Sequence, residues 1–182
     1  MHYLCCSVLW PNQQDRDFEA EEPNRKWVAD VTYIATASRW LYLAVVLDRF
    51  SRRVVGWAMA ATFDAALIEQ ALRMALTQRK PGAGLLHHSD RGCQYTSEAY
   101  QAFLKEHGIQ VSMSRKGNCW DNAVMERFFG TLKRECTSRE RFQTHEEART
   151  AIFEYIEAFY NRVRKHSTRG YLSPIQFEIV HS

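Results

Sequence analysis

The fold is decided by the segment "WVADVTYIATASRWLYLAVVLDRFSRRVVGWAMA", residues 27–60. Three runs rich in β-branched and aromatic residues lie within it, at 27–36, 40–48 and 52–60, and short polar connectors join them. Such residues favour strands, and short connectors join antiparallel neighbours. The middle run is almost entirely apolar, as a central strand would be. The segment therefore predicts an antiparallel meander of three strands.

Beyond residue 60 the spacing of apolar residues indicates alternating helices and strands. The pattern predicts, in order, a helix over 64–79, a strand over 85–90, a helix over 96–108, a strand over 109–114, and helices over 121–136 and 144–164. Asp64 is a suitable N-cap, and Thr144 with Glu147 three residues later predicts a capping box. This order indicates an α/β fold with a mixed sheet flanked by helices.

The composition limits the class of protein. A chain of 182 residues, 46% of them hydrophobic, can form one domain with a real core. The net charge of +3 is too small to identify a partner by itself. The five cysteines have no zinc-site spacing and fit a reducing compartment, and no apolar run approaches the roughly 20 residues of a membrane helix. We therefore expect a soluble cytoplasmic protein with no membrane partner.

Two aspartates stand where a carboxylate needs an explanation. Asp30 falls in the middle of a predicted strand, where a buried carboxylate without a partner would be costly. Asp90 ends a short strand, and ligand sites in α/β sheets lie beyond strand ends. Each also has an ordinary explanation, an ion pair or an exposed edge for Asp30 and a turn for Asp90. Asp48, at a predicted hairpin, is assigned a structural role.

The stretch "NCWDNAVMERFFG", residues 118–130, adds two more carboxylates. Asp121 directly precedes a predicted helix and is explained as its N-cap. Glu126 lies inside that helix, on the same stripe as Gly130 and Lys133. Glycine costs a helix about 1 kcal/mol relative to alanine, so Gly130 suggests the close approach of something bulky. Taken alone, Glu126 is equally an ordinary exposed glutamate.

Considered together, Asp30, Asp90 and Glu126 indicate a metal site. Three carboxylates that meet at one edge of the sheet repel one another unless cations neutralise them. Oxygen ligands without His or Cys favour Mg²⁺ or Mn²⁺. Two such ions, about 3.5–4 Å apart, stabilise both the attacking and the leaving oxygen of a phosphoryl displacement. The set therefore predicts a centre with two divalent ions that acts on phosphodiesters.

Basic residues near these carboxylates fit a nucleic-acid partner. The predicted DNA contacts are Arg115, Lys116, Lys133, Arg134, Arg162, Arg164 and Lys165. The last three belong to a basic tract with flanking tyrosines, "YNRVRKHSTRGY", which fits binding to a phosphate backbone. The alternative is a solvated or solubilising surface. Three further residues, His88, Asn118 and Asn122, are expected to support the site, although His88 is as readily a packed core histidine.

Several blocks of sequence resemble the catalytic core of DDE insertion-sequence transposases of the IS-three group, which are related to retroviral integrases. The matching blocks are "PNRKWVADVTYI", "LYLAVVLDRFSRRVVGWAM", "HHSDRGCQYTS", "SMSRKGNCWDNAVMERFFGTLKRE" and "FYNRVRKHSTRGYLSPIQFE". In addition, 35 residues lie between Asp90 and Glu126, the spacing that gives the DD(35)E subgroup its name. The resemblance extends over residues 11–179.

The resemblance implies an RNase H-like fold with sheet order 3-2-1-4-5. It implies a lead-in over 1–22 and an integrase catalytic core with a C-terminal helical extension over 23–182. It also makes Asp30, Asp90 and Glu126 the metal-binding triad of an enzyme that cleaves DNA and transfers strands. Such an enzyme acts on transposon ends and target DNA in the bacterial nucleoid, as a homo-oligomer and without a covalent protein–DNA intermediate.

One stretch departs from the family pattern. The first residues, "MHYLCCSVLW", do not resemble the N-terminal DNA-binding region of the family, so the chain is expected to be a truncated form. This leaves an alternative function, a non-autonomous derivative that binds DNA or hetero-oligomerises with an intact transposase and inhibits it. A nuclease of the same fold that cuts RNA in hybrids is a third possibility.

Overall fold

The computed structural model describes residues 20–90, 92–113 and 123–182. Its sheet has five strands in the order β3-β2-β1-β4-β5, which confirms the predicted order and fold class. The strands are β1 (Lys26–Ala35), β2 (Trp40–Asp48), β3 (Val54–Ala60), β4 (Leu86–Ser89) and β5 (Gln110–Met113). The α-helices are α1 (Ala65–Arg79), α2 (Glu98–Glu106), α3 (Ala123–Leu132), α4 (His145–Phe153) and α5 (Pro174–His181). Two π-helical segments, η2 (Lys133–Thr137) and η3 (Glu154–Tyr160), and a 3₁₀ turn, η4 (Ser167–Arg169), complete the fold.

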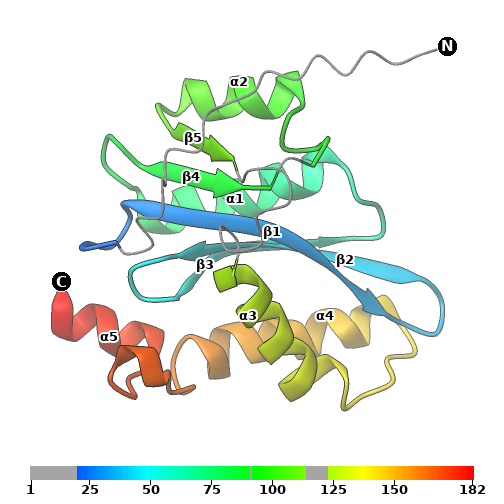
Figure 1. Ribbon diagram of the computed structural model, residues 1–182. Helices are drawn as coiled ribbons and strands as arrows, with labels where there is room; N and C mark the ends of the chain where they lie inside the picture. Colours follow the sequence, from blue (N-terminus) through cyan, green and yellow to red (C-terminus); the bar gives the residue numbers. More distant parts are fainter. Residues whose placement is uncertain (1–19, 91, 114–122) are drawn as a thin grey trace, which may run out of the picture.

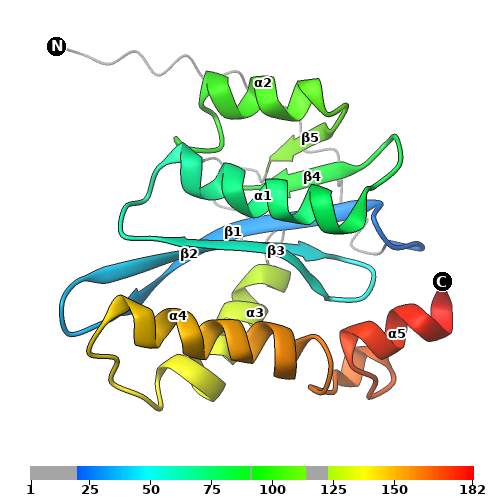
Figure 2. The ribbon, with the colours of Figure 1, turned by 180° about the vertical axis from the view of Figure 1, so that it is seen from behind.

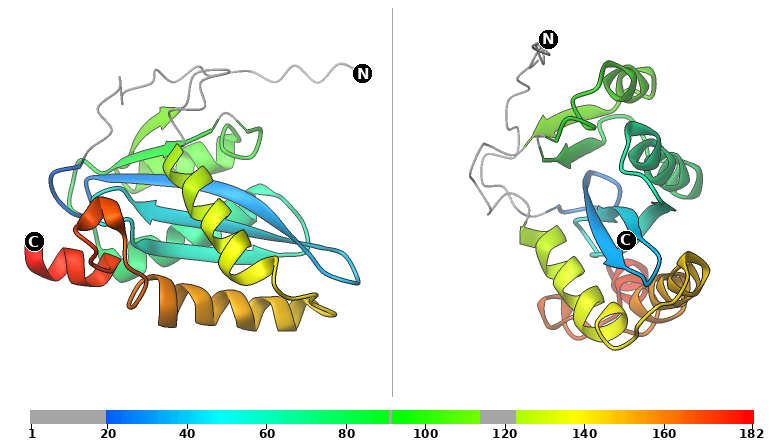
Figure 3. Two further views of the ribbon diagram at one scale, coloured as in Figure 1. Left: turned by 60° about the horizontal axis from the view of Figure 1, so that its bottom comes forward. Right: turned by 90° about the vertical axis from the view of Figure 1, so that its right-hand side faces the viewer.

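The strands pair as their connectors dictate. Short turns make β1, β2 and β3 antiparallel neighbours, whereas β4 and β5 follow crossover helices and run parallel to β1 and to each other. Figure 1 shows α3 in front of the sheet, and Figure 2, from behind, shows α1 lying along it. The edge-on view in Figure 3 shows the sheet between the two groups of helices. The sheet therefore has both faces covered.

Each face of the sheet has its own apolar core. Along β1, Trp27 and Ala29 pack with residues of α1 and α2, while Val28 packs with Met125 and Phe128 of α3. This alternation follows from the period of two in a strand, and it assigns even-numbered residues of β1 to the face that α3 covers. Asp30 is even-numbered and so belongs to the α3 face.

Helix α1 packs against β3 at a position that only glycine can occupy. A Cβ at Gly56 would lie 2.2 Å from the carbonyl oxygen of Ala71 and 2.7 Å from the Cβ of Ala75. Both residues are buried, and both lie on the side of α1 that faces the sheet. The missing side chain therefore sets how closely helix and sheet approach.

The helix termini agree with the prediction in part. Asp64 caps α1 by accepting a hydrogen bond from the Leu67 N–H at 3.1 Å, as predicted. At α4 the predicted capping box is only half formed: the Thr144 hydroxyl accepts from the Glu147 N–H, but the Glu147 carboxylate accepts from the Gln143 N–H at 2.7 Å rather than from that of Thr144. Asp121, the predicted cap of α3, lies outside the described residues.

The C-terminal part differs from the predicted helix over 144–164. The α-helix ends at Phe153 and continues as the π-helical segment η3 to Tyr160, so the predicted helix changes its hydrogen-bond pattern there and is wrong only beyond Tyr160. The chain then turns and forms α5, which the apolar pattern did not reveal. Ser173 and Gln176 form a full capping box there, with Pro174 at the start of the helix. This signal was present in the sequence, but the helix has only eight residues.

Helix α5 is fastened to the sheet by one glutamate. Glu178 accepts hydrogen bonds from Arg53 at 2.8 Å, from Arg79 at 2.9 and 3.0 Å, and from the Ser51 hydroxyl at 2.8 Å. Burial acts to raise the pKa of Glu178, but these donors outweigh it and hold the pKa below its ordinary value of 4.5. The carboxylate is therefore ionised in the native state, and both of its oxygens accept hydrogen bonds.

Asp48 lies beside this network and has the structural role that the sequence assigned to it. It is fully buried and accepts the backbone N–H groups of Asn24 at 2.7 Å and Phe50 at 3.0 Å. Burial raises its pKa to about 6, against the opposing effect of those two N–H groups and of Arg79. Its bonds fix the turn after β2, from which Arg52 extends.

We predict opposite effects for two glycine substitutions. Gly56→Ala forces a methyl group into the backbone of α1 and is expected to lower the free energy of unfolding by about 1–3 kcal/mol. Gly130→Ala adds a methyl group that meets nothing within 4 Å, on an exposed helix, and is expected to raise it by up to about 1 kcal/mol. Urea denaturation of the two variants measures both changes. Equal effects would contradict the packing described here.

We also predict that Glu178→Gln lowers the free energy of unfolding by about 2–3 kcal/mol at neutral pH, because it leaves two arginines without their carboxylate. The pKa of Glu178 is lowered on folding, so its contribution is present above about pH 4.5 and lost below it. The difference from wild type should therefore shrink in acid. Glu154→Gln, at an exposed position, is the matched control. A constant difference across this pH range would refute the ionic role.

Candidate active site

Asp30 and Asp90 occupy matching positions on neighbouring parallel strands. In the β1–β4 ladder, Lys26, Trp27 and Val28 pair with Leu86, His87 and His88. The same offset carried two residues further places Asp30, in β1, opposite Asp90, which directly follows β4. Because side chains alternate along a strand, both aspartates belong to the face that carries Val28, which α3 covers. The fold thus brings two carboxylates, 60 residues apart in the chain, to one edge of the sheet.

The buried hydroxyl of Tyr95 lies within electrostatic reach of both carboxylates. Its side chain is buried in the turn region that follows β4. Its pKa lies well above the ordinary value, first because of burial, then because of Tyr100, Asp30 and Asp90. Both carboxylates therefore lie close enough to the Tyr95 hydroxyl to oppose its ionisation.

Local hydrogen bonds orient the two aspartates. One oxygen of Asp30 accepts the N–H of Val31 at 2.8 Å, and one oxygen of Asp90 accepts the N–H of Gly92 at 2.9 Å. A Cβ at Gly92 would lie 3.0 Å from that same oxygen of Asp90, so glycine allows the turn to close tightly around the carboxylate. Both side chains are partly exposed, as a site that receives a ligand requires.

Glu126 lies in the first turn of α3, on its exposed side. Met125 and Phe128 on the other side anchor the helix to the sheet, so α3 carries Glu126 across the face that Asp30 occupies. Gly130, one turn further on, is exposed and surrounded by open space. The sequence prediction that something bulky approaches there stays a prediction.

Over residues 20–90, 92–113 and 123–182, no three His, Cys, Asp or Glu side chains are close enough together to hold a metal ion. The register of β1 and β4 places Asp30 opposite Asp90, and α3 carries Glu126 over the same face, but the three carboxylates do not form a closed metal site in this arrangement. The donor set itself fits Mg²⁺ or Mn²⁺, since carboxylate oxygens without thiolate or imidazole are the ligands these ions prefer.

Of the three residues expected to support the site, the structure describes only His88. His88 is fully buried, next to Val28 across the ladder, and its Nδ1 lies 3.0 Å from the Ser112 hydroxyl of β5. It thus lies one step before Asp90 on the same face of the sheet. Asn118 and Asn122 lie outside the described residues. His87, the residue before His88, faces the core on the other side of the sheet. Burial lowers the pKa of His87 to about 3, and the Tyr100 hydroxyl lies 2.8 Å from its Nε2.

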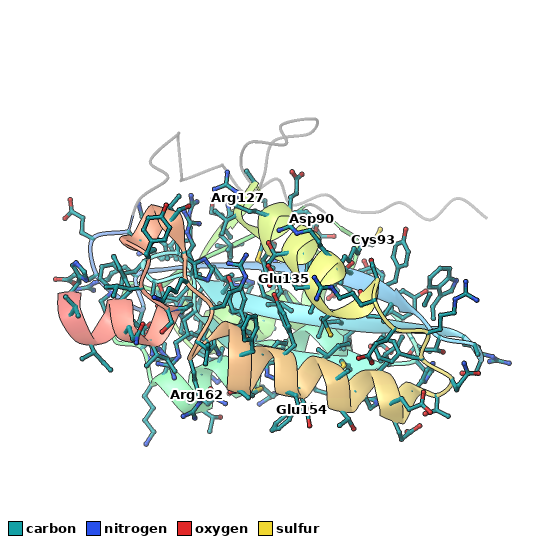
Figure 4. All side chains as sticks on the ribbon, turned by 90° about the horizontal axis from the view of Figure 1, so that it is seen from below. Asp90, Cys93, Arg127, Glu135, Glu154 and Arg162 are labelled. Carbon is teal, nitrogen blue, oxygen red and sulfur yellow. The ribbon has the colours of Figure 1, made fainter. Side chains whose placement is uncertain are left out.

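The predicted DNA contacts fall into different environments. Arg115 and Lys116 lie outside the described residues. Lys133 lies over the ring of Tyr33, 5.3 Å from its centroid, and Arg134 is exposed beside it. Figure 4 shows Arg162 at the opposite edge of the molecule from Asp90.

Arg164 and Lys165, two further predicted DNA contacts, differ in whether they already have a partner within the protein. Arg164 donates to Glu135 with Nε and Nη2, at 2.8 and 2.9 Å, so the structure gives it an internal partner. Lys165, by contrast, is exposed. Sequence reasoning missed Arg52 and Arg127, which lie close to this group; the position of Arg127 directly after Glu126 was the available signal.

Comparison with known proteins identifies the family. The model of the integrase core domain matches residues 20–119, and a second model, also described as an integrase core domain, matches residues 107–174. The chain belongs to the integrase core domain family. In this family member the three carboxylates singled out above lie on β1, after β4 and on α3.

Two relatives illustrate the similarity in sequence. The chain is 51% identical over 167 residues to the transposase InsF of insertion sequence IS3A from Escherichia coli, and 49% identical over 167 residues to a 31 kDa protein of insertion element IS600 from Shigella sonnei. Each match covers 92% of this chain. The chain spans 58% and 61% of the length of these two relatives, respectively.

Solved structures confirm the RNase H-like fold. The catalytic core of HTLV-2 integrase, solved in complex with magnesium in a dimeric form, superposes with a TM-score of 0.65 at 19% identity, covering 86% of this chain and 97% of that one. An integrase from a simian T-cell lymphotropic virus intasome gives a TM-score of 0.72 at 18% identity, covering 90% of this chain and 56% of that one. Among the described residues, no helix is long and apolar enough to cross a membrane.

The proximity of Asp30 and Asp90 makes a prediction about stability. In the presence of a chelator, Asp90→Asn should raise the free energy of unfolding by a few tenths to about 1 kcal/mol, because it removes repulsion between neighbouring carboxylates while its side-chain oxygen still accepts from Gly92. Asp64→Asn is the matched control, since Asn caps a helix as well as Asp. Thermal or urea unfolding in EDTA measures both. A marked loss of stability in Asp90→Asn would mean that this carboxylate holds the fold together.

Proposed function

We propose that this chain supplies the catalytic core of an insertion-sequence transposase, which cleaves DNA at an element's ends and joins the freed 3′-hydroxyl to target DNA with the help of divalent metal ions. The observation that carries the proposal is the pairing of Asp30 with Asp90 on adjacent parallel strands, beneath the helix that bears Glu126, in an integrase fold. The transposase name of its relatives supports the reaction class.

The metal-binding role falls to three residues. Asp30, Asp90 and Glu126 would together hold Mg²⁺ or Mn²⁺ through their carboxylate oxygens. When bound, such ions polarise a phosphodiester and stabilise the charge on its attacking and leaving oxygens. The magnesium present in a solved relative supports this choice of cofactor.

The remaining residues would hold the substrate in place. Lys133 begins η2, directly after the helix that carries Glu126, so its ammonium group can bind a phosphate close to the reacting one. His88 would fix the end of β4 through Ser112 and thereby position Asp90. No covalent link between protein and DNA is required, because water and then the 3′-hydroxyl act as the nucleophiles. The dimeric and trimeric forms of a solved relative support a homo-oligomer as the acting species.

The test is a strand-transfer assay with a pre-cleaved donor end taken from the DNA that flanks this gene. We predict that Asp30→Asn, Asp90→Asn and Glu126→Gln each lower joining by at least about 100-fold, more than residues that merely support a metal ligand usually do. Joining should require Mg²⁺ or Mn²⁺ and stop on addition of EDTA. Glu154→Gln, far from Asp90 in Figure 4, is the control. Full activity of all three triad variants would refute the proposal.

The alternative functions make different predictions. An inhibitory derivative would reduce transposition by an intact transposase when co-expressed, and the triad substitutions would not alter that effect. A hybrid nuclease would degrade an RNA–DNA hybrid in preference to duplex DNA. Neither the described residues nor the comparisons favour these alternatives.

A further inference from the structure

A pocket of about 380 Å³ lies beside the candidate active site and is lined by positive charge. Its walls come from α3, from the turn between β2 and β3, and from the segment that follows η3. The charged side chains that line it are Arg52, Arg127, Arg134, Arg164 and Lys165, and no Asp or Glu is among the lining residues. Glu135, which lies next to it, is already bound by Arg164 and by the Tyr155 hydroxyl at 2.8 Å. The pocket therefore has an excess of positive charge.

Arg52 is a partly buried arginine of this pocket that has other arginines close to it. It sits in the turn after β2 with a left-handed backbone, φ 67°. Its Nη1 is buried without a hydrogen-bond partner among the described residues. Burial, together with the neighbouring charges of Arg169, Arg49 and Arg127, lowers its pKa to about 10. An arginine held in this way is costly unless an anion offsets the charge.

His166 also lines the pocket, and its pKa responds to neighbouring arginines. Its ring packs edge-on against Tyr160, with the ring centroids 5.1 Å apart, and its Nε2 is buried without a hydrogen-bond partner among the described residues. Burial lowers its pKa to about 4, with Arg164, Arg52 and Arg169 acting in the same direction. The ring is therefore neutral at pH 7, and the pocket offers donors but no competing acid.

Helix α3 connects this pocket with the candidate active site. Val124, Arg127, Thr131 and Arg134 line the pocket, and their spacing of three and four residues places them on one stripe of the helix. Glu126, Gly130 and Lys133 form the adjoining stripe. Among the described residues, the side chains of Arg127 and Arg134 have no hydrogen bond or ion pair, and Figure 4 shows Arg127 on α3, well away from Arg162. Both arginines are free to meet a ligand.

We propose that this pocket is a phosphate-binding site, and that its ligand is a backbone phosphodiester of the DNA strand engaged at the neighbouring carboxylates. Guanidinium groups bind phosphate oxygens through paired N–H donors, which suits a site built from arginines. The assignment of DNA as the source rests on the proposed function. The pocket would then hold the strand one phosphate or more away from the reacting bond and fix its register relative to Glu126.

The experiment compares wild type with Arg127→Gln/Arg134→Gln, two exposed positions that can change without disturbing the core. Binding to a duplex oligonucleotide is measured by fluorescence anisotropy in EDTA over a range of salt concentrations, so that no cleavage occurs. Each lost phosphate contact should reduce the slope of log K against log salt by about 0.9, so we expect the slope to fall by about 1–2. Arg73→Gln/Lys80→Gln, on α1, makes the same change of net charge and should leave the slope as in wild type.

A second measurement identifies the source of the phosphate. Inorganic phosphate should raise the thermal midpoint of wild type relative to chloride at equal ionic strength, and the double variant should lose this shift. Arg52→Gln should lose it as well. If wild type shows the shift but binds no duplex, the pocket stands as an anion site and the proposed function fails. If duplex is bound and the double variant keeps the wild-type salt slope, the assignment to DNA is overturned.

A third variant separates the pocket from the chemistry. Asp90→Asn should lose strand transfer while keeping both the salt slope and the phosphate shift. The Arg127→Gln/Arg134→Gln variant should lower metal-dependent strand transfer already at low salt, and should lose the remaining activity more steeply than wild type as salt rises. Equal salt sensitivity of strand transfer in the two proteins would also overturn the proposal.

Discussion

The candidate site depends on the parallel pairing of β1 with β4. Only three residue pairs are hydrogen-bonded in that ladder, yet its register decides that Asp30 lies beside Asp90. A shift of one residue would move the carboxylates to opposite faces of the sheet, because side chains alternate along a strand. The hydrophobic pattern prevents this shift, since Trp27 and Val28 are both fully buried, on opposite faces. Two apolar cores therefore hold two like charges near each other.

Helix α3 adds the second constraint. Met125, Phe128 and Leu132 bind it to one face of the sheet, and this leaves two other stripes open. One carries Glu126 and Lys133, and the other carries Arg127 and Arg134. A single helix thus presents a carboxylate for a cation next to arginines for an anion. This arrangement explains why acidic and basic residues occur together over 126–135, which is puzzling when the sequence is read on its own.

Much of this could be predicted from the sequence. The three strands after residue 26 and the N-cap at Asp64 follow from local patterns, because alternation and capping act over a few residues. The sheet order came from the family resemblance, since pairing between distant strands leaves little local signal. The pairing of Arg164 with Glu135 and the burial of Arg52 were not predictable, because they depend on how the chain folds back after η3. Charge alone had suggested that Arg164 was available to DNA.

The central claim is that Asp30 and Asp90 share a cation which also recruits Glu126. The most direct measurement is anomalous diffraction from crystals of the protein soaked in Mn²⁺, with a donor DNA end bound. The account predicts an anomalous peak between the two aspartates, with oxygens of Asp30, Asp90 and Glu126 coordinating the manganese. A saturated crystal with no peak at that edge of the sheet, or with Glu126 still apart from the bound ion, would contradict it.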